Sequence, residues 1–154
     1  MNTDISVTLK ALATTPSGVG VFLTDGAKVI AIFVDPIVAA AMAMAAQGVK
    51  APRPLTHDLL ADILAGLGAR VQKVVIHDLK DDTFFARLYL VQENESGRHL
   101  LEVDARPSDS IALALRQRAP IYVSPAVWTR AEDMTWALEQ AQRKAQQEDG
   151  KEGA

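Results

Sequence analysis

Two short polar clusters carry the residues of this chain that are best suited to chemistry. Each has an Arg-Pro pair with a hydroxyl and a carboxylate after it, and each leads into a leucine-rich helical run: Arg53-Pro54-Leu55-Thr56-His57-Asp58 and Asp104-Ala105-Arg106-Pro107-Ser108-Asp109. Backbone N–H groups at the start of a helix favour anions. Cations, carboxylates and a histidine at two helix starts are the parts that a phosphate-handling site needs.

The functional interpretation of the two clusters is cleavage of a phosphodiester bond. Carboxylates can hold Mg²⁺ or Mn²⁺ or place a water molecule, arginine offsets charge on the pentavalent transition state, and histidine transfers protons. The predicted catalytic residues are His57, Asp58, Asp104 and Asp109. The predicted metal ligands are Asp58 and Asp109. The predicted phosphate-binding residues are Arg53, Arg106 and Ser108.

A purely structural interpretation uses the same atoms. Thr56 is expected to be the N-cap of the first helix, and either Arg106 or Ser108 that of the second. A carboxylate in the first turn of a helix is stabilised by about 0.3–1 kcal/mol without any function. An arginine of either cluster that bridges a nearby carboxylate would simply pin the two helix starts together. On residue types and spacing alone, this structural interpretation is the favoured one.

Composition narrows the class of protein. The chain has 154 residues, 49% of them hydrophobic, with a net charge of −3 and no cysteine. This length is enough for one domain with a sizeable core. The charge argues against nonspecific coating of nucleic acid, and the missing cysteines exclude disulfides and thiolate ligands, so any metal would be a hard cation. No organic cofactor is expected. No apolar run is long enough for a membrane span and no signal peptide is evident, so we expect a cytoplasmic protein.

The hydrophobic pattern predicts a mixed α+β fold. β-rich runs indicate strands at 5–11, 19–23, 29–34, 70–79, 83–91, 99–104 and 120–123. Helical spacing indicates helices at 38–46, 59–67 and 111–115 and from 126 onward, the second with Leu59, Leu60, Ile63, Leu64 and Leu67 on one stripe. We expect a mixed sheet of six to seven strands with helices packed on it, as a single compact domain over residues 1–128. Residues 129–154 are expected to form a C-terminal helix and, after Gln146, a disordered tail.

The stretch from Val19 to about Val127 resembles the bifunctional nuclease domain family. The resemblance rests on Arg53-Pro54-Leu55-Thr56-His57-Asp58-Leu59-Leu60, on the run from Val103 through Asp109 to Ala114, and on the Phe-containing hairpin between them. It implies a compact α+β domain that forms homo-oligomers, dimers or higher, and that acts on DNA and RNA as a nuclease. It also implies that the family's polar signature comprises His57, Asp58, Asp104, Arg106 and Asp109.

The chain departs from the family pattern at one place. Where the family usually has a glycine and then a Glu-Ala pair at the start of the first helix, this sequence has Asp35 and Val38-Ala39. Two functions therefore stay open: a nuclease-type phosphodiesterase, and a noncatalytic, oligomeric binding or scaffold domain of the same fold with a degenerate site. A helix-mediated partner function for residues 130–146 is a third.

Overall fold

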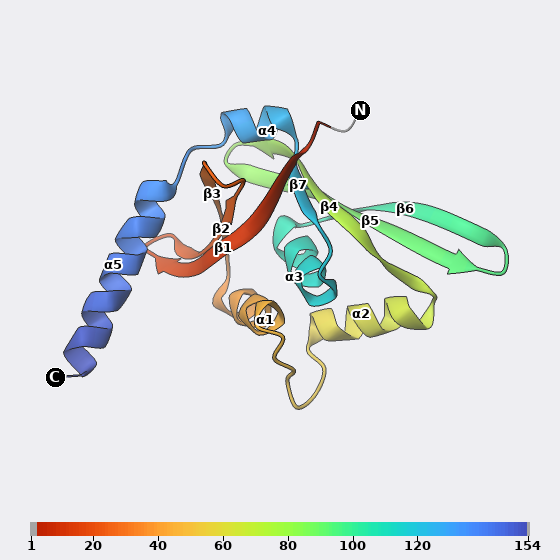
Figure 1. Ribbon diagram of the computed structural model, residues 1–154, viewed down its shortest axis with the longest axis horizontal. Helices are drawn as coiled ribbons and strands as arrows, with labels where there is room; N and C mark the ends of the chain where they lie inside the picture. Colours follow the sequence, from red (N-terminus) through yellow and green to blue (C-terminus); the bar gives the residue numbers. More distant parts are fainter. Residues whose placement is uncertain (1–2, 154) are drawn as a thin grey trace.

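The computed structural model describes residues 3–153, which fold around one seven-stranded mixed sheet (Figure 1). Its strands are β1 (Ile5–Thr15), β2 (Gly18–Thr24), β3 (Val29–Val34), β4 (Ala69–Lys80), β5 (Thr83–Asn94), β6 (Gly97–Ala105) and β7 (Ile121–Val123). The strand order is β3-β2-β1-β7-β4-β5-β6. β7 runs parallel to β4 and antiparallel to β1, while the other neighbours are antiparallel. The predicted fold class is confirmed.

Local turn chemistry explains the β2–β3 and β4–β5 hairpins. Between β2 and β3, Asp25 Oδ1 accepts hydrogen bonds from the amides of Ala27 and Lys28, both at 2.9 Å. Between β4 and β5, Asp81 and Asp82 take φ angles of 50° and 60°. Two successive positive φ angles are typical of a type I′ turn, whose twist matches that of the paired strands.

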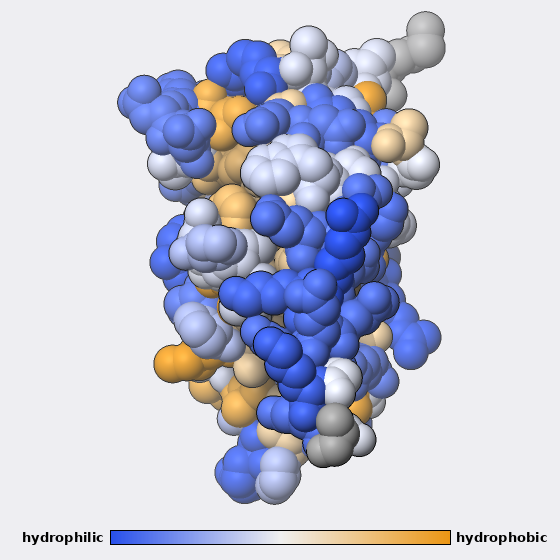
Figure 2. Space-filling model, turned by 90° about the vertical axis from the view of Figure 1, so that its left-hand side faces the viewer, coloured by the Kyte–Doolittle hydropathy of each residue, from blue (hydrophilic) through white to orange (hydrophobic). Residues whose placement is uncertain are grey.

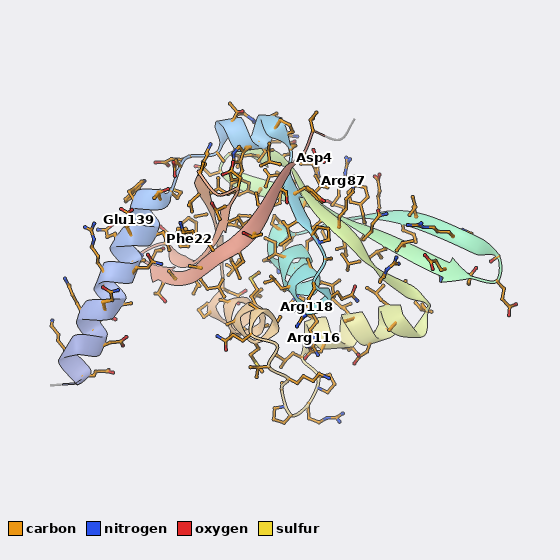
Figure 3. The ribbon with its side chains drawn as sticks, in the orientation of Figure 1. Asp4, Phe22, Arg87, Arg116, Arg118 and Glu139 are labelled. Carbon is orange, nitrogen blue, oxygen red and sulfur yellow. The ribbon has the colours of Figure 1, made fainter. Side chains whose placement is uncertain are left out.

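Five helices cover the two faces of the sheet unequally within residues 3–153. They are α1 (Pro36–Ala46), α2 (Thr56–Gly66), α3 (Pro107–Gln117), α4 (Pro125–Arg130) and α5 (Thr135–Glu152). Side chains from α1 and α3 join the main core on one face, whereas α5 packs through Leu138 on the opposite face of β2 and β3. The β2 run is buried on both faces, because Val21 and Leu23 enter the main core and Phe22 lies under α5 (Figure 3).

Three features of the helices differ from expectation. The helix expected from residue 126 onward is two helices, because the backbone is extended at Ala131. α5 continues to Glu152, so the disorder expected after Gln146 is wrong; residues 139–152 are rich in Gln, Glu, Lys and Ala, which favour helix. The outward surface of α5 is largely hydrophilic (Figure 2).

The third difference is in α2, which has no fully buried residue. Leu64 and Ala61 pack against the main core. The rest of the predicted apolar stripe is exposed: Leu59, Leu60, Ile63 and Leu67. The helix therefore turns its His57–Ala61–Leu64 side inward and leaves most of its leucines outside.

None of the helices in the described part of the chain combines the length and hydropathy that crossing a bilayer would require. The cytoplasmic location stays a prediction.

Candidate functional site

The start of α2 is capped differently from expectation. Leu55 is the N-cap residue, and Asp58 Oδ2 accepts a hydrogen bond from its backbone N–H at 3.0 Å. Thr56 is the first helical residue, so its prediction as the N-cap is wrong. The carboxylate, not the hydroxyl, satisfies the backbone group here because it reaches back from the third helical position.

The start of α3 decides between the two cap residues left open by the sequence. Arg106 is the N-cap, in extended conformation, with Pro107 at the first helical position. The Ser110 hydroxyl donates to the Arg106 carbonyl at 2.9 Å. This fixes the backbone of Arg106 while leaving its side chain free to extend from the helix start.

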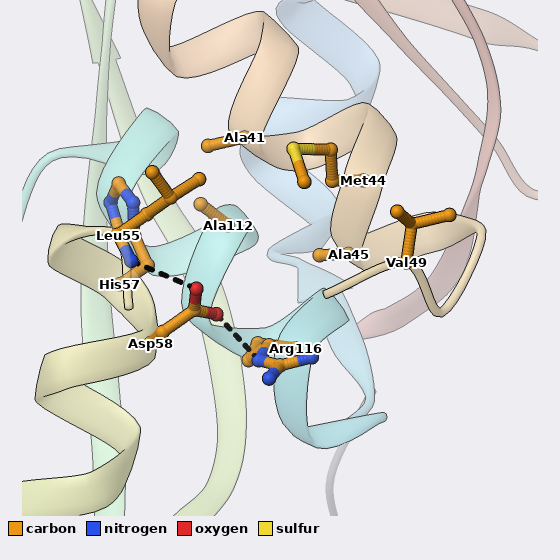
Figure 4. A pocket seen from close by; sticks show the side chains of 9 residues that line it. All are labelled: Ala41, Met44, Ala45, Val49, Leu55, His57, Asp58, Ala112 and Arg116. Atoms are coloured by element: carbon orange, nitrogen blue, oxygen red, sulfur yellow. Dashed lines mark hydrogen bonds and ion pairs between the residues drawn. The ribbon is translucent and has the colours of Figure 1, made fainter. Parts of the chain in front are cut away.

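Two side-chain contacts join α2 to α3. His57 Nε2 lies 3.1 Å from Asp109 Oδ1, and Arg116 Nε lies 2.6 Å from Asp58 Oδ1. Asp109 and Arg116 are seven residues apart and so share one face of α3. Consecutive residues of α2 therefore meet partners two helical turns apart on α3; the Asp58 contacts to Leu55 and Arg116 are drawn in Figure 4.

The surroundings of the Asp58–Arg116 pair indicate that it stabilises the structure. Its side chains are only 18% and 24% exposed, and the carboxylate also accepts the Leu55 amide. Both oxygens of Asp58 are thus engaged within the protein. A partly buried ion pair of this kind positions two helices, and removing one partner leaves the other charge uncompensated.

Asp109 connects a sheltered histidine with an exposed arginine. Its Oδ1 contacts His57, whose side chain is 12% exposed, and its Oδ2 accepts a hydrogen bond from Arg106 Nε at 3.2 Å. The Arg106 side chain is 72% exposed. The three residues form a row from the α2–α3 contact to the surface, which we call the Arg106–Asp109–His57 row.

The structure does not bring the other predicted residues into this row. Asp104 lies on β6 opposite Arg87 of β5, is exposed, and has no ion-pair partner within residues 3–153. Arg53 is exposed in the connector before α2, where the described residues offer it no carboxylate partner. Ser108 is half-buried at the start of α3.

The donor set does not fit the predicted metal. Within residues 3–153, no three histidine, aspartate or glutamate side chains gather closely enough to share an ion. The two predicted ligands are each engaged by an arginine, Asp58 by Arg116 and Asp109 by Arg106. Each carboxylate is therefore already paired with an arginine of this chain.

Two hollows adjoin the site. A cavity of about 10 Å³, roughly the room of one water molecule, lies between α1, α2 and α3 and is lined in part by His57, Asp58 and Arg116 (Figure 4). A groove of about 660 Å³ is lined in part by Arg106 and Ser108. This volume falls in the range of small-molecule sites.

The groove combines two arginines, two carboxylates and two aromatic rings, contributed by Arg106, Arg130, Asp82, Glu132, Phe33 and Phe84. Both terminal nitrogens of the Arg130 guanidinium have partners within the protein, since NH1 donates to the Leu79 carbonyl at 2.8 Å and NH2 lies 3.3 Å from Asp78 Oδ1. The hydrogen bond from the Leu79 amide, and then that from Arg130, lowers the pKa of Asp78 below its ordinary value. Arg106 is thus the arginine of the groove with free donors for a ligand.

Sequence reasoning missed Arg116 and Arg130. The signal for Arg116 was its seven-residue spacing from Asp109, which places both on one face of α3. Arg130 had no such signal, because it meets Asp78 across the fold. At the departure from the family pattern, Asp35 caps α1 by accepting the Val38 amide at 3.0 Å, and Val38 packs against the main core.

Comparison with known proteins agrees with the resemblance seen in the motifs. An uncharacterized protein of Mycobacterium tuberculosis is 44% identical over 107 residues, which cover 70% of this chain and 61% of that protein. Bifunctional nuclease 1 of Oryza sativa subsp. japonica is 29% identical over 80 residues, 52% of this chain and 24% of the relative. Bifunctional nuclease 2 of Arabidopsis thaliana is 30% identical over 76 residues, 49% of this chain and 23% of the relative.

The family pattern matches a longer segment of this chain than any of these three relatives does. The chain spans about three fifths of the mycobacterial relative and about a quarter of each plant protein. The sequence pattern of the bifunctional nuclease domain matches residues 21–135, a segment that includes both polar clusters, the whole Arg106–Asp109–His57 row and most of the sheet. The chain therefore belongs to the bifunctional nuclease domain family.

Proposed function

We propose that this chain is a nuclease-type phosphodiesterase that acts on DNA, RNA or both, with its site at the Arg106–Asp109–His57 row. The observation that carries the proposal is the geometry of Asp109, whose two oxygens contact Arg106 at 3.2 Å and His57 at 3.1 Å. An exposed guanidinium and a sheltered imidazole are thereby held at one carboxylate. The plant relatives, which are named bifunctional nucleases, support the same class of activity.

Each member of the row has a role in hydrolysis. Arg106 contacts Asp109 through Nε, so its terminal nitrogens remain as donors for the non-bridging oxygens of a phosphate. Asp109 accepts from His57 Nε2 and leaves Nδ1 to take a proton from the attacking water. The water oxygen bonds to phosphorus, the bridging P–O bond breaks, and the leaving oxygen takes up the proton that His57 removed from the water. Ser108 is a further donor beside Arg106.

Exposure separates this proposal from a purely structural role for Arg106. If Arg106 held the fold together, its pair with Asp109 would be buried, yet the two side chains are 72% and 41% exposed. Exposed ion pairs contribute about 0–1 kcal/mol. Arg106→Ala should therefore change the free energy of unfolding by less than about 1 kcal/mol while it abolishes phosphate binding.

The groove suggests how much of a nucleic acid the site engages. Its lining includes two arginines and two carboxylates, so the groove has no net formal charge, and the chain as a whole has a net charge of −3. Nonspecific affinity for nucleic acid grows with the number of phosphates that cations contact. We infer that the site holds one or two phosphates of a strand locally and does not coat a polymer.

The remaining parts of the proposal are the metal, three further residues and self-association. No step is assigned to Mg²⁺ or Mn²⁺, and metal dependence stays a prediction that chelation of the purified protein tests. Asp58 acts by positioning His57 through the α2–α3 contact. Roles for Asp104 and Arg53 stay predictions, because neither lies at the row. The apolar surface that α2 exposes supports a homo-oligomer as the working form.

The test is cleavage of single-stranded DNA, duplex DNA and RNA oligonucleotides by highly purified protein. We expect His57→Ala and Asp109→Ala to lower the rate by about 10²–10⁴-fold, the usual contribution of a positioned acid or base. Arg143→Ala is the matched control, since Arg143 lies exposed on α5 away from the groove. All variants are purified identically so that a contaminating nuclease would appear in each. Cleavage that survives in both site variants would refute the assignment.

A second candidate is a noncatalytic nucleic-acid-binding domain of the same fold. Val38 favours it, because an apolar side chain packed against the core stands where the family usually carries a glutamate. This function predicts that oligonucleotides bind without being cut and that Arg106→Ala removes binding. Fluorescence anisotropy measured beside the cleavage assay distinguishes the two functions.

A further inference from the structure

The outer edge of β6 is unusually open for a long strand. β6 lies at the end of the sheet, pairs with β5 without any irregularity, and has eight exposed residues out of nine. Natural edge strands are usually protected by charged side chains, proline, a bulge or a covering element, and the charges of β6 are Arg98, Glu102 and Asp104. The sequence Gly-Arg-His-Leu-Leu-Glu-Val-Asp-Ala contains no proline or lysine, and no other strand within residues 3–153 pairs with this edge. A strand of this length spans roughly 30 Å of free backbone groups.

The β5–β6 turn determines which backbone groups point outward. Glu95 and Ser96 form a two-residue loop, and Asn94 pairs with Gly97. A two-residue hairpin loop is closed by a hydrogen-bonded pair, and such pairs alternate along an antiparallel ladder. The odd-numbered residues of β6 therefore bond to β5. The N–H and C=O groups of Arg98, Leu100, Glu102 and Asp104 point away from the sheet.

These outward residues are complementary to their own copy. In an antiparallel pair centred on Leu100, Arg98 of each copy lies opposite Glu102 of the other, and the two Leu100 side chains meet. Centring the pair on Arg98 or on Glu102 would put like charges together, which is unfavourable. Centring it on Leu101 would put Leu100 opposite Glu102. The Leu100 register is thus the one that matches both charge and hydropathy.

Exposed apolar side chains accompany the free edge. Leu100 is 68% exposed, and Leu101 and Val103 are exposed on the helix-bearing face. The end of α2 is tied to β5, the neighbour of β6, where Gln92 Nε2 donates to the Leu67 carbonyl at 2.9 Å. The exposed leucines of α2 therefore lie in the same half of the molecule as β6 (Figure 1). Clustered apolar exposure of this kind marks an interaction surface.

We propose that a second copy of this chain pairs its β6 antiparallel to β6 about a two-fold axis at Leu100, joining two seven-stranded sheets into one. This inference names the surface for the self-association included in the proposed function, but it requires no catalytic activity. The interface is isologous: the same strand serves both partners and closes the assembly as a dimer.

Charge reversal tests the register. Arg98→Glu and Glu102→Arg each replace two attractive cross-strand pairs by two repulsive ones, so each should raise the dimer dissociation constant by about tenfold or more. The double variant Arg98→Glu/Glu102→Arg restores attraction and should dimerise more tightly than either single variant. Mass is measured by size-exclusion chromatography with light scattering over a dilution series, and circular dichroism establishes that each variant is folded.

Asp104→Arg is the matched control, because this residue is on the same strand and carries the same charge but would face Ser96 of the second copy. It should leave the dimer intact. A monomeric wild-type chain, a double variant no tighter than the singles, or a dimer lost only with Asp104→Arg would each overturn the proposal. Oligonucleotide cleavage measured on the same samples keeps the two proposals apart: a dimer that does not cut refutes only the function, and a monomer that cuts refutes only the interface.

Discussion

At the scale of single residues, Asp58 and Asp109 each lie in the first turn of a helix but have different surroundings. Asp58 is held by Arg116 and by the Leu55 amide, and both its side chain and that of Arg116 are largely covered. Asp109 is half-exposed between His57 and Arg106. Replacing the first carboxylate should affect the fold, and replacing the second should affect the chemistry.

Asp58→Asn should lower the free energy of unfolding by about 1–3 kcal/mol, because it weakens the contact that caps α2 and leaves the Arg116 charge poorly compensated. Chemical denaturation measures the change. Asp62→Asn is the control, since Asp62 lies on the same helix with no ion-pair partner among the described residues. An equally stable Asp58→Asn protein would show that the pair does not hold α2 in place.

Sequence reasoning named the three residues that lie in the row, but not the contacts between them. His57, Arg106 and Asp109 stood in the two motifs, and the helix starts that carry them were recognisable from Pro107 and from the leucine spacing. Arg116 was not predicted because an arginine inside a helical run is usually a solvated side chain. Which arginine bridges which aspartate depends on how α2 crosses α3, and local patterns do not specify that crossing.

At the scale of elements, the turn between β4 and β5 departs from the residues that such turns favour. Asp81 and Asp82 both have positive φ, where glycine is the unstrained choice at the second position. Asp82→Gly should therefore raise the free energy of unfolding by about 0.5–1 kcal/mol. Thermal or chemical denaturation measures it, and Asp82→Val, whose branched side chain resists positive φ, should have the opposite effect. Destabilisation by the glycine would contradict the turn geometry.

The start of α5 provides a pH-dependent anchor. Asp133 Oδ1 accepts from the Thr135 hydroxyl at 2.6 Å, from the Thr135 amide at 3.0 Å and from Val29 of β3 at 3.5 Å. The hydroxyl contact, then the amide, holds the pKa of Asp133 below its ordinary value of 3.8. A group whose pKa is lower in the folded state stabilises the fold above the unfolded pKa and loses that contribution as the pH falls.

The thermal stability of the wild type should therefore fall more steeply between about pH 5 and pH 3 than that of Asp133→Asn, because the variant has no carboxyl group to protonate at this position. The melting temperature measured across this range checks the prediction. All other carboxyl groups are the same in both proteins, so the difference between the two curves isolates Asp133. Parallel curves would show that its hydrogen bonds contribute nothing to stability.

The elements were the most predictable level of this molecule. β-rich runs at 19–23 and 29–34 indicated the strands β2 and β3, and those at 70–79 and 83–91 indicated β4 and β5. The exposed stripe of α2 was unpredictable, because an apolar stripe on a helix does not say whether its cover is the same chain or another. The extent of α5 was not predictable from polarity, because Gln, Glu and Lys are common in disordered segments and also favour helix.

At the scale of the whole molecule, the sheet has two halves, β1–β3 and β4–β6, each built from consecutive hairpins. The sequence could not show how these halves join. β1, β2 and β3 follow one another directly, as do β4, β5 and β6. Sequence neighbours pair readily through short turns, so each half was expected. The contact between the halves depends on a strand from residues 121–123, far from both in the chain.

β7 therefore also sets the order in which this protein is completed. Its three residues pair Ile5–Val7 on one side and Val74–Ile76 on the other. During synthesis the first three strands emerge early and the next three follow, but neither group can be joined to the other until residue 123 has left the ribosome. Until then the nascent chain holds two small sheets with open inner edges, which makes the interval before β7 arrives the one in which this fold is most exposed to mispairing and most in need of a chaperone.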